Sequence, residues 1–318
     1  MASASPPGST GLAATLVTLV LWSLTASLTL QLTHLPPAEV VAVTFLLAGL
    51  ACLPFVRSWR VPLRTFLMCS LCCAAYRLVF VEAFKLSPHV ETNLIFGLNT
   101  VLIVLFSPAA LPGYRLRPNH VIGVVVGCAG VVLAVGYGHL HPTIRDLPAY
   151  LLAIGGAVLW ALYSLALKRL PPVASTSMGG SLLGAGLITS ALVWTLPGAS
   201  LALPTPTQWS SLVTLAIGPT AIAYITWDRA MKSGDPRIVA SIMNLGPLTS
   251  TLLIIVINHQ PMTWQLMLGA VIVVVGSFIG CLEMFQRYFQ PPALVLPADV
   301  ASAGPPGDAP TPVADLVA

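Results

Sequence analysis

The chain has 318 residues, of which 56% are hydrophobic and only 8% are charged, and its formal net charge is +4. Its mean hydropathy is +0.89. An ordinary soluble domain carries about 25% charged residues, so this composition excludes the soluble globular classes. No basic face with interleaved aromatic residues accompanies the small positive charge, and we therefore expect no nucleic-acid partner.

Short breaks that hold most of the charged residues divide the chain into ten apolar segments. Each segment has about twenty residues, the length that one helix needs to cross a hydrocarbon core. Helices are expected because an open strand would leave its backbone groups unsatisfied in lipid. The predicted spans are 11–31, 38–56, 65–84, 90–111, 119–137, 147–168, 175–196, 208–230, 237–258 and 264–286. The fold class is therefore an all-α membrane protein with ten transmembrane helices.

The two chain ends are expected to be simple extensions of this helical region. Met1 to Thr10 contains no Lys or Arg, so we interpret 11–31 as a retained helix and not as a cleaved signal peptide. The residues before it form a short N-terminal cytoplasmic segment, 1–10. The tail 291–318 is rich in Pro and Ala without apolar periodicity, which predicts a disordered cytoplasmic tail.

Orientation follows from the positive residues in the loops, which are enriched on the cytoplasmic side. One set of loops and ends contains eleven of them: Arg57, Arg60, Arg64, Arg115, Arg117, Lys168, Arg169, Arg229, Lys232, Arg237 and Arg287. The opposite set contains only Lys85 and Arg145. We therefore predict a multi-pass protein of the inner membrane with both termini in the cytoplasm.

Landmarks in the first half recur in the same order in the second. Leu21-Trp22-Ser23-Leu24 corresponds to Leu159-Trp160-Ala161-Leu162, and each is followed by Leu-Pro-Pro. A spacing of twelve separates Tyr76 from Pro88 and Tyr224 from Pro236, and a spacing of seven separates Gly123 from Gly130 and Gly269 from Gly276. The chain is therefore interpreted as a duplicated five-helix unit, 11–137 and 147–286.

Because five is an odd number, the second unit must enter the membrane from the side opposite to the first. Inverted repeats of this kind are the architecture of many secondary transporters, in which the two halves exchange conformations around a central site. Inversion therefore favours alternating access.

The same landmarks resemble the drug/metabolite transporter superfamily. The resemblance rests on the Trp-containing first helix of each half, the stretch Ala223–Pro236, the run Asn244–Leu248 and the Gly-rich last helix. Within it, the chain is most similar to EamA-type exporters and more loosely to the aromatic amino acid exporter branch. That branch tends to carry a Trp-Pro pair in its fourth helix, where this chain has Gly97-Leu98-Asn99-Thr100. The difference predicts a pocket that is locally more polar.

The resemblance implies a transport path between the helices of the two halves, so polar and aromatic residues at membrane depth become the candidates for substrate binding. They are Trp22, Tyr76, Arg77, Asn99, Trp160, Tyr163, Tyr224, Trp227 and Asn244. For the aromatic rings the alternatives are core packing or an interfacial belt. For the amides the alternative is hydrogen bonding between helices. Arg77 is expected to meet a substrate carboxylate or an acidic side chain such as Glu91, the alternative being that it reaches toward the interface. Asp228 is expected to be a surface charge at a helix end.

No nucleotide-binding loop, catalytic triad or metal-ligand spacing occurs, so we expect no enzyme activity, no metal site and no cofactor. Glycine spacings such as Gly123-x-x-x-Gly127 and Gly276-x-x-x-Gly280 favour close helix packing within the bundle. A homodimer through 119–137 and 264–286 is an alternative use of the same faces. The expected partners are membrane lipid and a small-molecule substrate.

The sequence thus predicts a secondary transporter that exports small metabolites, amino acids or similar zwitterions, by alternating access. Two alternatives stay open at this point. One is a multidrug exporter of lipophilic cations within the same superfamily, and the other is a non-transporting membrane scaffold.

The orientation can be tested with reporter fusions. A fluorescent protein that matures only in the cytoplasm should be bright when fused before Gly11 or after Phe289, and alkaline phosphatase should be inactive there. At Arg145 the reverse pattern is expected. Opposite locations of the two ends would contradict the odd-numbered repeat.

Overall fold

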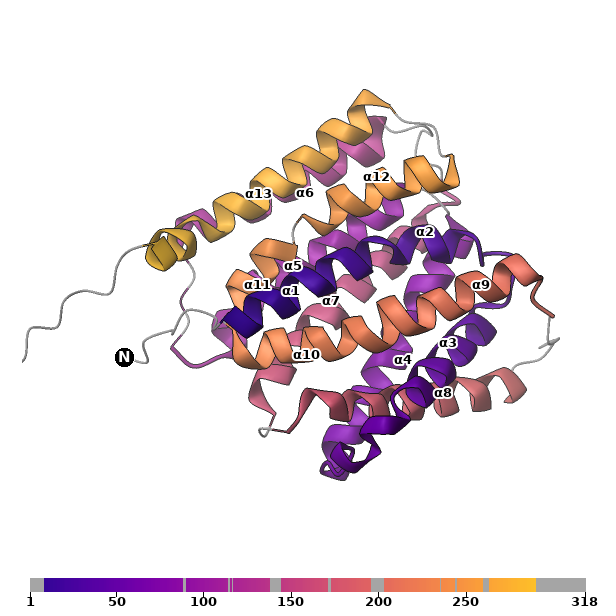
Figure 1. The fold of residues 1–318 in the computed structure, drawn as a ribbon. Coiled ribbons are helices and arrows are strands. Elements are labelled where there is room, and N and C mark those ends of the chain that lie inside the picture. The colour runs from indigo at the N-terminus through magenta and orange to yellow at the C-terminus, as the bar shows by residue number, and fades with distance from the viewer. Residues whose placement is uncertain are drawn as a thin grey trace, which may run out of the picture.

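The computed structural model describes residues 9–87, 90–113, 115, 117–137, 144–170, 173–195, 203–234, 236–243, 245–259 and 263–289. Every regular element in these ranges is a helix (Figure 1). The first half contains α1 (Ser9–Ser23), α2 (Thr25–Leu30), α3 (Pro37–Ala51), η1 (Leu53–Ser58), α4 (Leu63–Leu86), α5 (Val90–Ala110) and α6 (Pro118–Tyr137). The second half contains α7 (Leu147–Arg169), η2 (Ser175–Ser177), α8 (Met178–Thr195), α9 (Pro206–Leu215), η3 (Ala216–Ile222), α10 (Ala223–Ser233), α11 (Pro236–Met243), α12 (Gly246–Asn258) and α13 (Trp264–Phe289). The predicted tail 291–318 lies outside the described residues, as do Met1 to Gly8.

Six of the helical stretches are long and apolar enough to cross a membrane. They are Thr10–Leu30, Leu63–Leu86, Thr92–Ala110, Leu147–Arg169, Ser175–Thr195 and Pro206–Ser233. Four shorter apolar helices, Pro37–Ala51, Val121–Gly130, Leu248–Asn258 and Trp264–Gly276, lie within or overlap the remaining predicted segments. The chain is therefore a multi-pass, all-helical membrane protein across its described residues.

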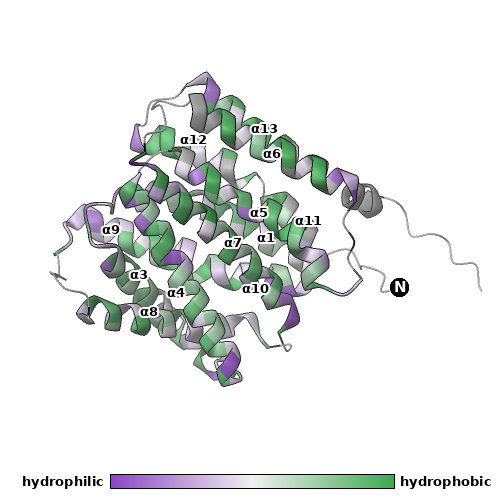
Figure 2. Ribbon diagram, turned by 180° about the vertical axis from the view of Figure 1, so that it is seen from behind, coloured by the Kyte–Doolittle hydropathy of each residue, from purple (hydrophilic) through white to green (hydrophobic). Residues whose placement is uncertain are grey.

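The outer surface of the bundle is apolar, as lipid contact requires. Large hydrophobic side chains on separate helices are between 59% and 67% exposed, namely Val20, Val125, Leu151, Leu187 and Val256. In Figure 2 hydrophobic residues dominate the helices, while hydrophilic residues gather mainly at helix ends and connections. In lipid this exposure is favourable, because the surrounding chains are as apolar as the side chains.

Helices from the two halves pack against each other in reciprocal pairs. Helix α1 packs on α10, and the equivalent contact in the other half is that of α7 on α4. In the same way, α5 packs on α7 and α12 packs on α1. Helices α3 and α8 form a further pair at one side, and α6 and α13 lie side by side at the opposite edge (Figure 1). The pairs α3/α8 and α6/α13 join repeat-equivalent helices, and the other contacts occur in two equivalent sets, so the two halves are intertwined and enclose the centre between them.

Glycines allow α6 and α13 to approach until their backbones touch. A Cβ built on Gly130 would lie 2.7 Å from the carbonyl oxygen of Gly269 and 2.8 Å from the backbone nitrogen of Val273. A Cβ on Gly276 would meet the backbone of Gly127 and lie 2.7 Å from the carbonyl oxygen of Gly123. The predicted glycine faces therefore pack on each other within one chain.

Helix irregularities gather around the centre of the bundle. The first helix is divided at Leu24, the eighth predicted segment contains the π-helical turn η3 with Pro219 inside it, and the ninth is interrupted between α11 and α12. Proline removes a backbone donor, and a π-helical turn is frequent at functional sites. Helix α12 begins at Gly246 and has Pro247 in its first turn.

Gly130→Ala tests the packing of α6 on α13. The added methyl group must displace backbone atoms, so we expect a loss of about 1–3 kcal/mol in stability and a lower unfolding temperature in detergent. Gly155→Ala is the matched control, because a Cβ at Gly155 meets nothing within 4 Å. Equal unfolding temperatures for the two variants would contradict the close contact.

Candidate functional site

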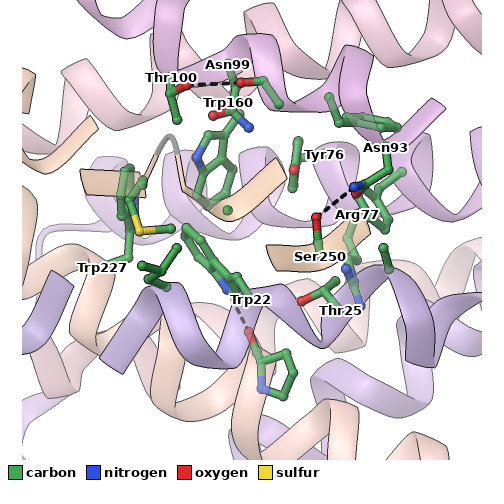
Figure 3. A pocket seen from close by; sticks show the side chains of 18 of the residues that line it. Trp22, Thr25, Tyr76, Arg77, Asn93, Asn99, Thr100, Trp160, Trp227 and Ser250 are labelled. Carbon is green, nitrogen blue, oxygen red and sulfur yellow. Dashed lines mark hydrogen bonds between the residues drawn. The ribbon is translucent and has the colours of Figure 1, made fainter. Parts of the chain in front are cut away.

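A cavity of about 110 Å³ lies between the two halves. Its walls come from α1, α2, α4 and α5 in the first half and from α7, η3, α10, α11 and α12 in the second. Aromatic rings form most of one wall, and a smaller set of polar side chains lies opposite them (Figure 3). Its position between repeats, in the centre of the bundle, is the place where transporters of duplicated architecture bind their substrates.

Five aromatic residues form the apolar wall of this cavity, and each ring contacts at least one of the others. The ring centroids of Trp22 and Trp160 are 5.2 Å apart, and those of Trp22 and Trp227 are 5.1 Å apart. Tyr76 lies 4.5 Å from Trp160, and Tyr224 lies 5.9 Å from Trp22. These separations are within the range of favourable ring contacts. The wall is therefore rigid and suited to another ring or an aliphatic group.

Four residues of the aromatic wall form two repeat-equivalent pairs. Trp22 and Trp160 are repeat-equivalent, as are Tyr76 and Tyr224. Each Trp contacts the Tyr of the other repeat, and the two Trp rings contact each other edge to face. The duplicated residues therefore meet where the two repeats meet.

The indole of Trp22 is held in place by the π-helical turn. Its Nε1 donates a hydrogen bond of 2.9 Å to the backbone carbonyl oxygen of Pro219. A widened turn leaves carbonyl oxygens that can accept from outside their own helix. The irregular backbone of η3 thus orients a side chain that lines the cavity.

Arg77 is the charged residue in the cavity lining, and it is only 4% exposed. Its guanidinium lies 5.1 Å from the centroid of the Phe80 ring, a cation–π contact that holds the group in position. Its Nη2 has no hydrogen-bond partner, and within the described residues no ion pair to Arg77 is formed. Arg77 therefore presents a buried positive charge to the cavity.

Three polar side chains lie close to Arg77 at the same end of the cavity (Figure 3). The Oγ1 of Thr25 is buried and, like Nη2 of Arg77, has no hydrogen-bond partner. The amide of Asn93 donates a hydrogen bond of 2.7 Å to the Oγ of Ser250. Asn99 and Thr100 line the cavity farther along α5. Unsatisfied buried polar atoms are rare in folded proteins, so these two groups are available to a ligand that enters the cavity.

Seven of the nine predicted site residues line this cavity: Trp22, Tyr76, Arg77, Asn99, Trp160, Tyr224 and Trp227. Tyr163 does not. Its ring lies 5.3 Å from that of Trp160, but its hydroxyl donates to the Sδ of Met178 and accepts from the Sγ of Cys73, away from the cavity. The structure therefore places Tyr163 outside the lining of this cavity. Asn244 lies outside the described residues, as does the side chain of Glu91.

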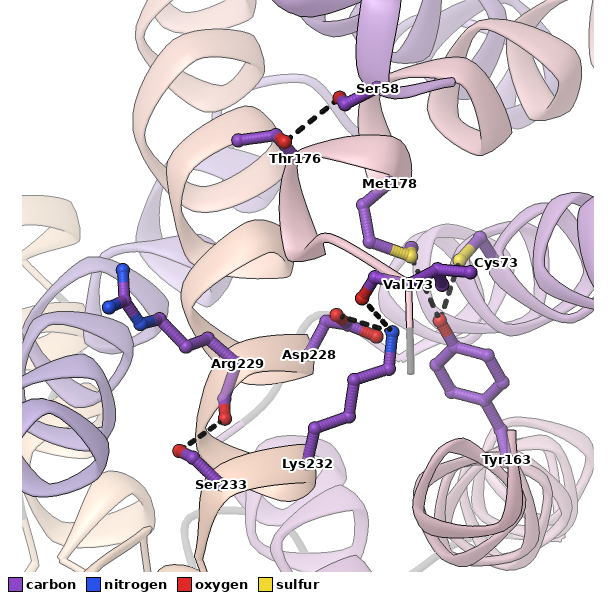
Figure 4. Close-up of polar contacts among 10 residues, drawn as sticks. All are labelled: Ser58, Cys73, Tyr163, Val173, Thr176, Met178, Asp228, Arg229, Lys232 and Ser233. Carbon is purple, nitrogen blue, oxygen red and sulfur yellow. Dashed lines mark hydrogen bonds and ion pairs between the residues drawn. The ribbon is translucent and has the colours of Figure 1, made fainter. Parts of the chain in front are cut away.

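Asp228 also differs from its prediction. It was expected to be a surface charge, but it is 1% exposed and forms an ion pair of 2.9 Å with the Nζ of Lys232 (Figure 4). Lys168 donates to the carbonyl oxygens of Lys232 and Gly234, at 3.1 and 2.6 Å, and so caps α10. The helix-end interpretation failed because α7 and the segment before η2 cover this end of α10.

Sequence reasoning missed Thr25, Ser250 and Pro219 as lining residues. Thr25 follows Trp22 by three residues, so the two would share a helical face, and this spacing could have identified it. Ser250 and Pro219 carry no comparable signal, because only the packing of the second half brings them to the cavity. In the described part of the chain, no group of three potential ligands could hold a metal ion.

The comparisons with known proteins agree with this architecture. The model of the EamA-like transporter family matches residues 9–136 and, a second time, residues 147–280. The chain belongs to the EamA-like transporter family. Two matches to one family model also establish that this EamA-like transporter is a duplication.

Two curated relatives extend the comparison. The aromatic amino acid exporter YddG of Ancylobacter novellus is 34% identical over 273 residues, which cover 83% of this chain and 94% of the relative. The uncharacterized transporter YvbV of Bacillus subtilis is 28% identical over 223 residues, covering 60% of this chain and 68% of the relative. A solved crystal structure with 30% sequence identity superposes with a TM-score of 0.73 and covers 90% of this chain and 100% of its own.

The buried ion pair gives a stability prediction. In Lys232→Met the carboxylate of Asp228 stays buried without its partner, so we expect a loss of about 3 kcal/mol, measured as a lower unfolding temperature in detergent. The double variant Asp228→Asn/Lys232→Met should recover most of it. Lys85→Met, at an exposed lysine, is the control and should unfold like the unmodified protein. A double variant less stable than Lys232→Met would contradict this interpretation.

Proposed function

We propose that this EamA-like transporter exports amino acids across the inner membrane by alternating access, as a secondary transporter. The family and the relative described as an aromatic amino acid exporter support a membrane exporter of small metabolites. The amino acid substrate, the direction and the mechanism are our proposal.

The proposal rests on one observation. Arg77 is buried, its Nη2 has no hydrogen-bond partner among the described residues, and it faces a cavity whose opposite wall consists of aromatic rings. A guanidinium binds a carboxylate through two parallel hydrogen bonds, which is the strongest pairing available to it. The rings provide apolar surface for a side chain. An amino acid with an apolar or aromatic side chain satisfies both requirements at once.

The proposed mechanism requires ten spans arranged as inverted repeats, with units 11–137 and 147–286 and both termini in the cytoplasm. The reciprocal packing of repeat-equivalent helices supports a two-fold relation between the units. The positions of the positive residues support the orientation. In such an arrangement the two units exchange conformations, so that the cavity faces the two compartments in turn.

The charge of the cavity argues against the alternative of a multidrug exporter of lipophilic cations. Such an exporter needs a carboxylate to pair with its substrate, whereas the lining residues include Arg77 and, within the described part of the chain, neither Asp nor Glu. A membrane scaffold would have no need for a cavity with unsatisfied polar atoms.

Counterflow in proteoliposomes tests the proposal. Vesicles preloaded with unlabelled L-phenylalanine should take up radiolabelled L-phenylalanine transiently above equilibrium. Trp160→Ala removes ring contacts and buried area of the aromatic wall, worth about 1.4 kcal/mol or more, so half-saturation should rise by about tenfold.

Lys85→Met is the control and should exchange like the unmodified protein, and gel filtration shows whether each variant is folded. Absence of exchange for every amino acid tested would support a scaffold. Exchange of tetraphenylphosphonium in place of amino acids would support the multidrug alternative.

A further inference from the structure

We propose that the cavity of this transporter selects aromatic monocarboxylates and does not require an α-amino group. Aromatic 2-hydroxy acids and 2-oxo acids would then be substrates alongside the amino acids. The inference rests on the proposed function, since it concerns the same cavity, and it names the part of the substrate that the cavity recognises.

The charge of the cavity lining favours a monocarboxylate. Arg77 contributes a positive charge that is 4% exposed, and the described lining residues contribute no carboxylate to balance it. A monocarboxylate would make the loaded cavity neutral. A zwitterion would add an ammonium without a partner, and an amine would place a second positive charge beside the first. Buried charges are tolerated when they are paired, so charge balance favours the monocarboxylate.

Arg77 and Thr25 form one end of the cavity, the anion-binding end. Nη2 of Arg77 and Oγ1 of Thr25 are both buried, both without hydrogen-bond partners, and both belong to the cavity lining. Figure 3 shows them on the same side of the cavity. Both groups can donate to a carboxylate oxygen, and the contact of the guanidinium with Phe80 restricts its movement. The carboxylate is therefore the substrate group for which the protein supplies unused donors.

The wall opposite Arg77 is where an ammonium would have to bind. Trp22, Tyr76 and Trp160 present rings there, and rings attract cations when no other positive charge is near. Here a fixed guanidinium lines the same small cavity, and repulsion between like charges is strong where water is scarce. The rings are thus better suited to a neutral aromatic side chain than to an ammonium.

The test compares three ligands that share a phenyl ring. Radiolabelled 3-phenyllactate, L-phenylalanine and phenethylamine are measured in counterflow with the full chain in proteoliposomes, and protein-free vesicles give the passive leak. We expect 3-phenyllactate to exchange at least as well as L-phenylalanine and phenethylamine to remain at the leak. The unfolding temperature of the purified protein in detergent should rise with 3-phenyllactate and stay constant with phenethylamine, which measures binding independently of transport.

Variants assign the selectivity to the anion-binding end. Arg77→Gln should raise half-saturation for 3-phenyllactate by roughly tenfold to a hundredfold, the loss expected for a charge-assisted hydrogen bond, and Thr25→Val by about threefold to tenfold. Thr15→Val is the matched control, because Thr15 in α1 is buried as Thr25 is, but its Oγ1 donates to the carbonyl oxygen of Gly11 and the residue does not line the cavity. Arg77→Lys keeps the charge if Arg77→Gln fails to fold, and it should bind 3-phenyllactate more tightly than phenethylamine.

The outcomes separate this inference from the proposed function. Exchange of L-phenylalanine without exchange of 3-phenyllactate would overturn the inference and leave amino acid export standing. Exchange of phenethylamine as fast as 3-phenyllactate would also overturn it. If no ligand exchanges and none raises the unfolding temperature, both proposals fail.

Discussion

The buried charge of Arg77 is the constraint on which the organisation of the site depends. A charged side chain at the centre of a membrane helix costs about 3 kcal/mol even on the most permissive scales. Here the cost is offset only in part, by the ring of Phe80 at 5.1 Å, since Nη2 has no hydrogen-bond partner. A group kept in this condition is best explained by a ligand that completes its contacts. Thr25, Asn93 and Ser250 make the surroundings polar enough for that ligand to be an anion.

The duplication explains the shape of the cavity, and the differences between the repeats explain its chemistry. The aromatic wall contains two repeat-equivalent pairs, Trp22 with Trp160 and Tyr76 with Tyr224, and the second half adds Trp227. By the same spacing, the residue equivalent to Arg77 is Ile225. Only one half therefore supplies the positive charge. In the proposed mechanism, the paired rings would let the two halves exchange conformations around the substrate, whereas a single charge would give the substrate one orientation.

Irregular backbone is what allows side chains and carbonyl groups to converge at membrane depth. A regular helix satisfies its own backbone groups and has none to offer. The π-helical turn η3 provides the carbonyl oxygen of Pro219 to Trp22, and the interruption between α11 and α12 lies next to Gly246, another lining residue. Away from the cavity the packing is of a different kind. Glycines bring α6 and α13 into backbone contact at the edge of the bundle, which leaves the centre for the transport path.

The sequence by itself determined the helical membrane class, the duplication and most of the aromatic wall. It could do so because span length, repeated spacing and mid-helix position are properties of the chain alone. The tertiary structure decided which polar atoms are left without partners, and this depends on neighbours far away in sequence. It placed Tyr163 against Met178 and Cys73 outside the cavity, and it buried Asp228 beside Lys232. It also brought Ser250 to Asn93, 157 positions earlier in the chain. Helical periodicity specifies the face on which a side chain lies, but only the packing of the other helices specifies what that face meets.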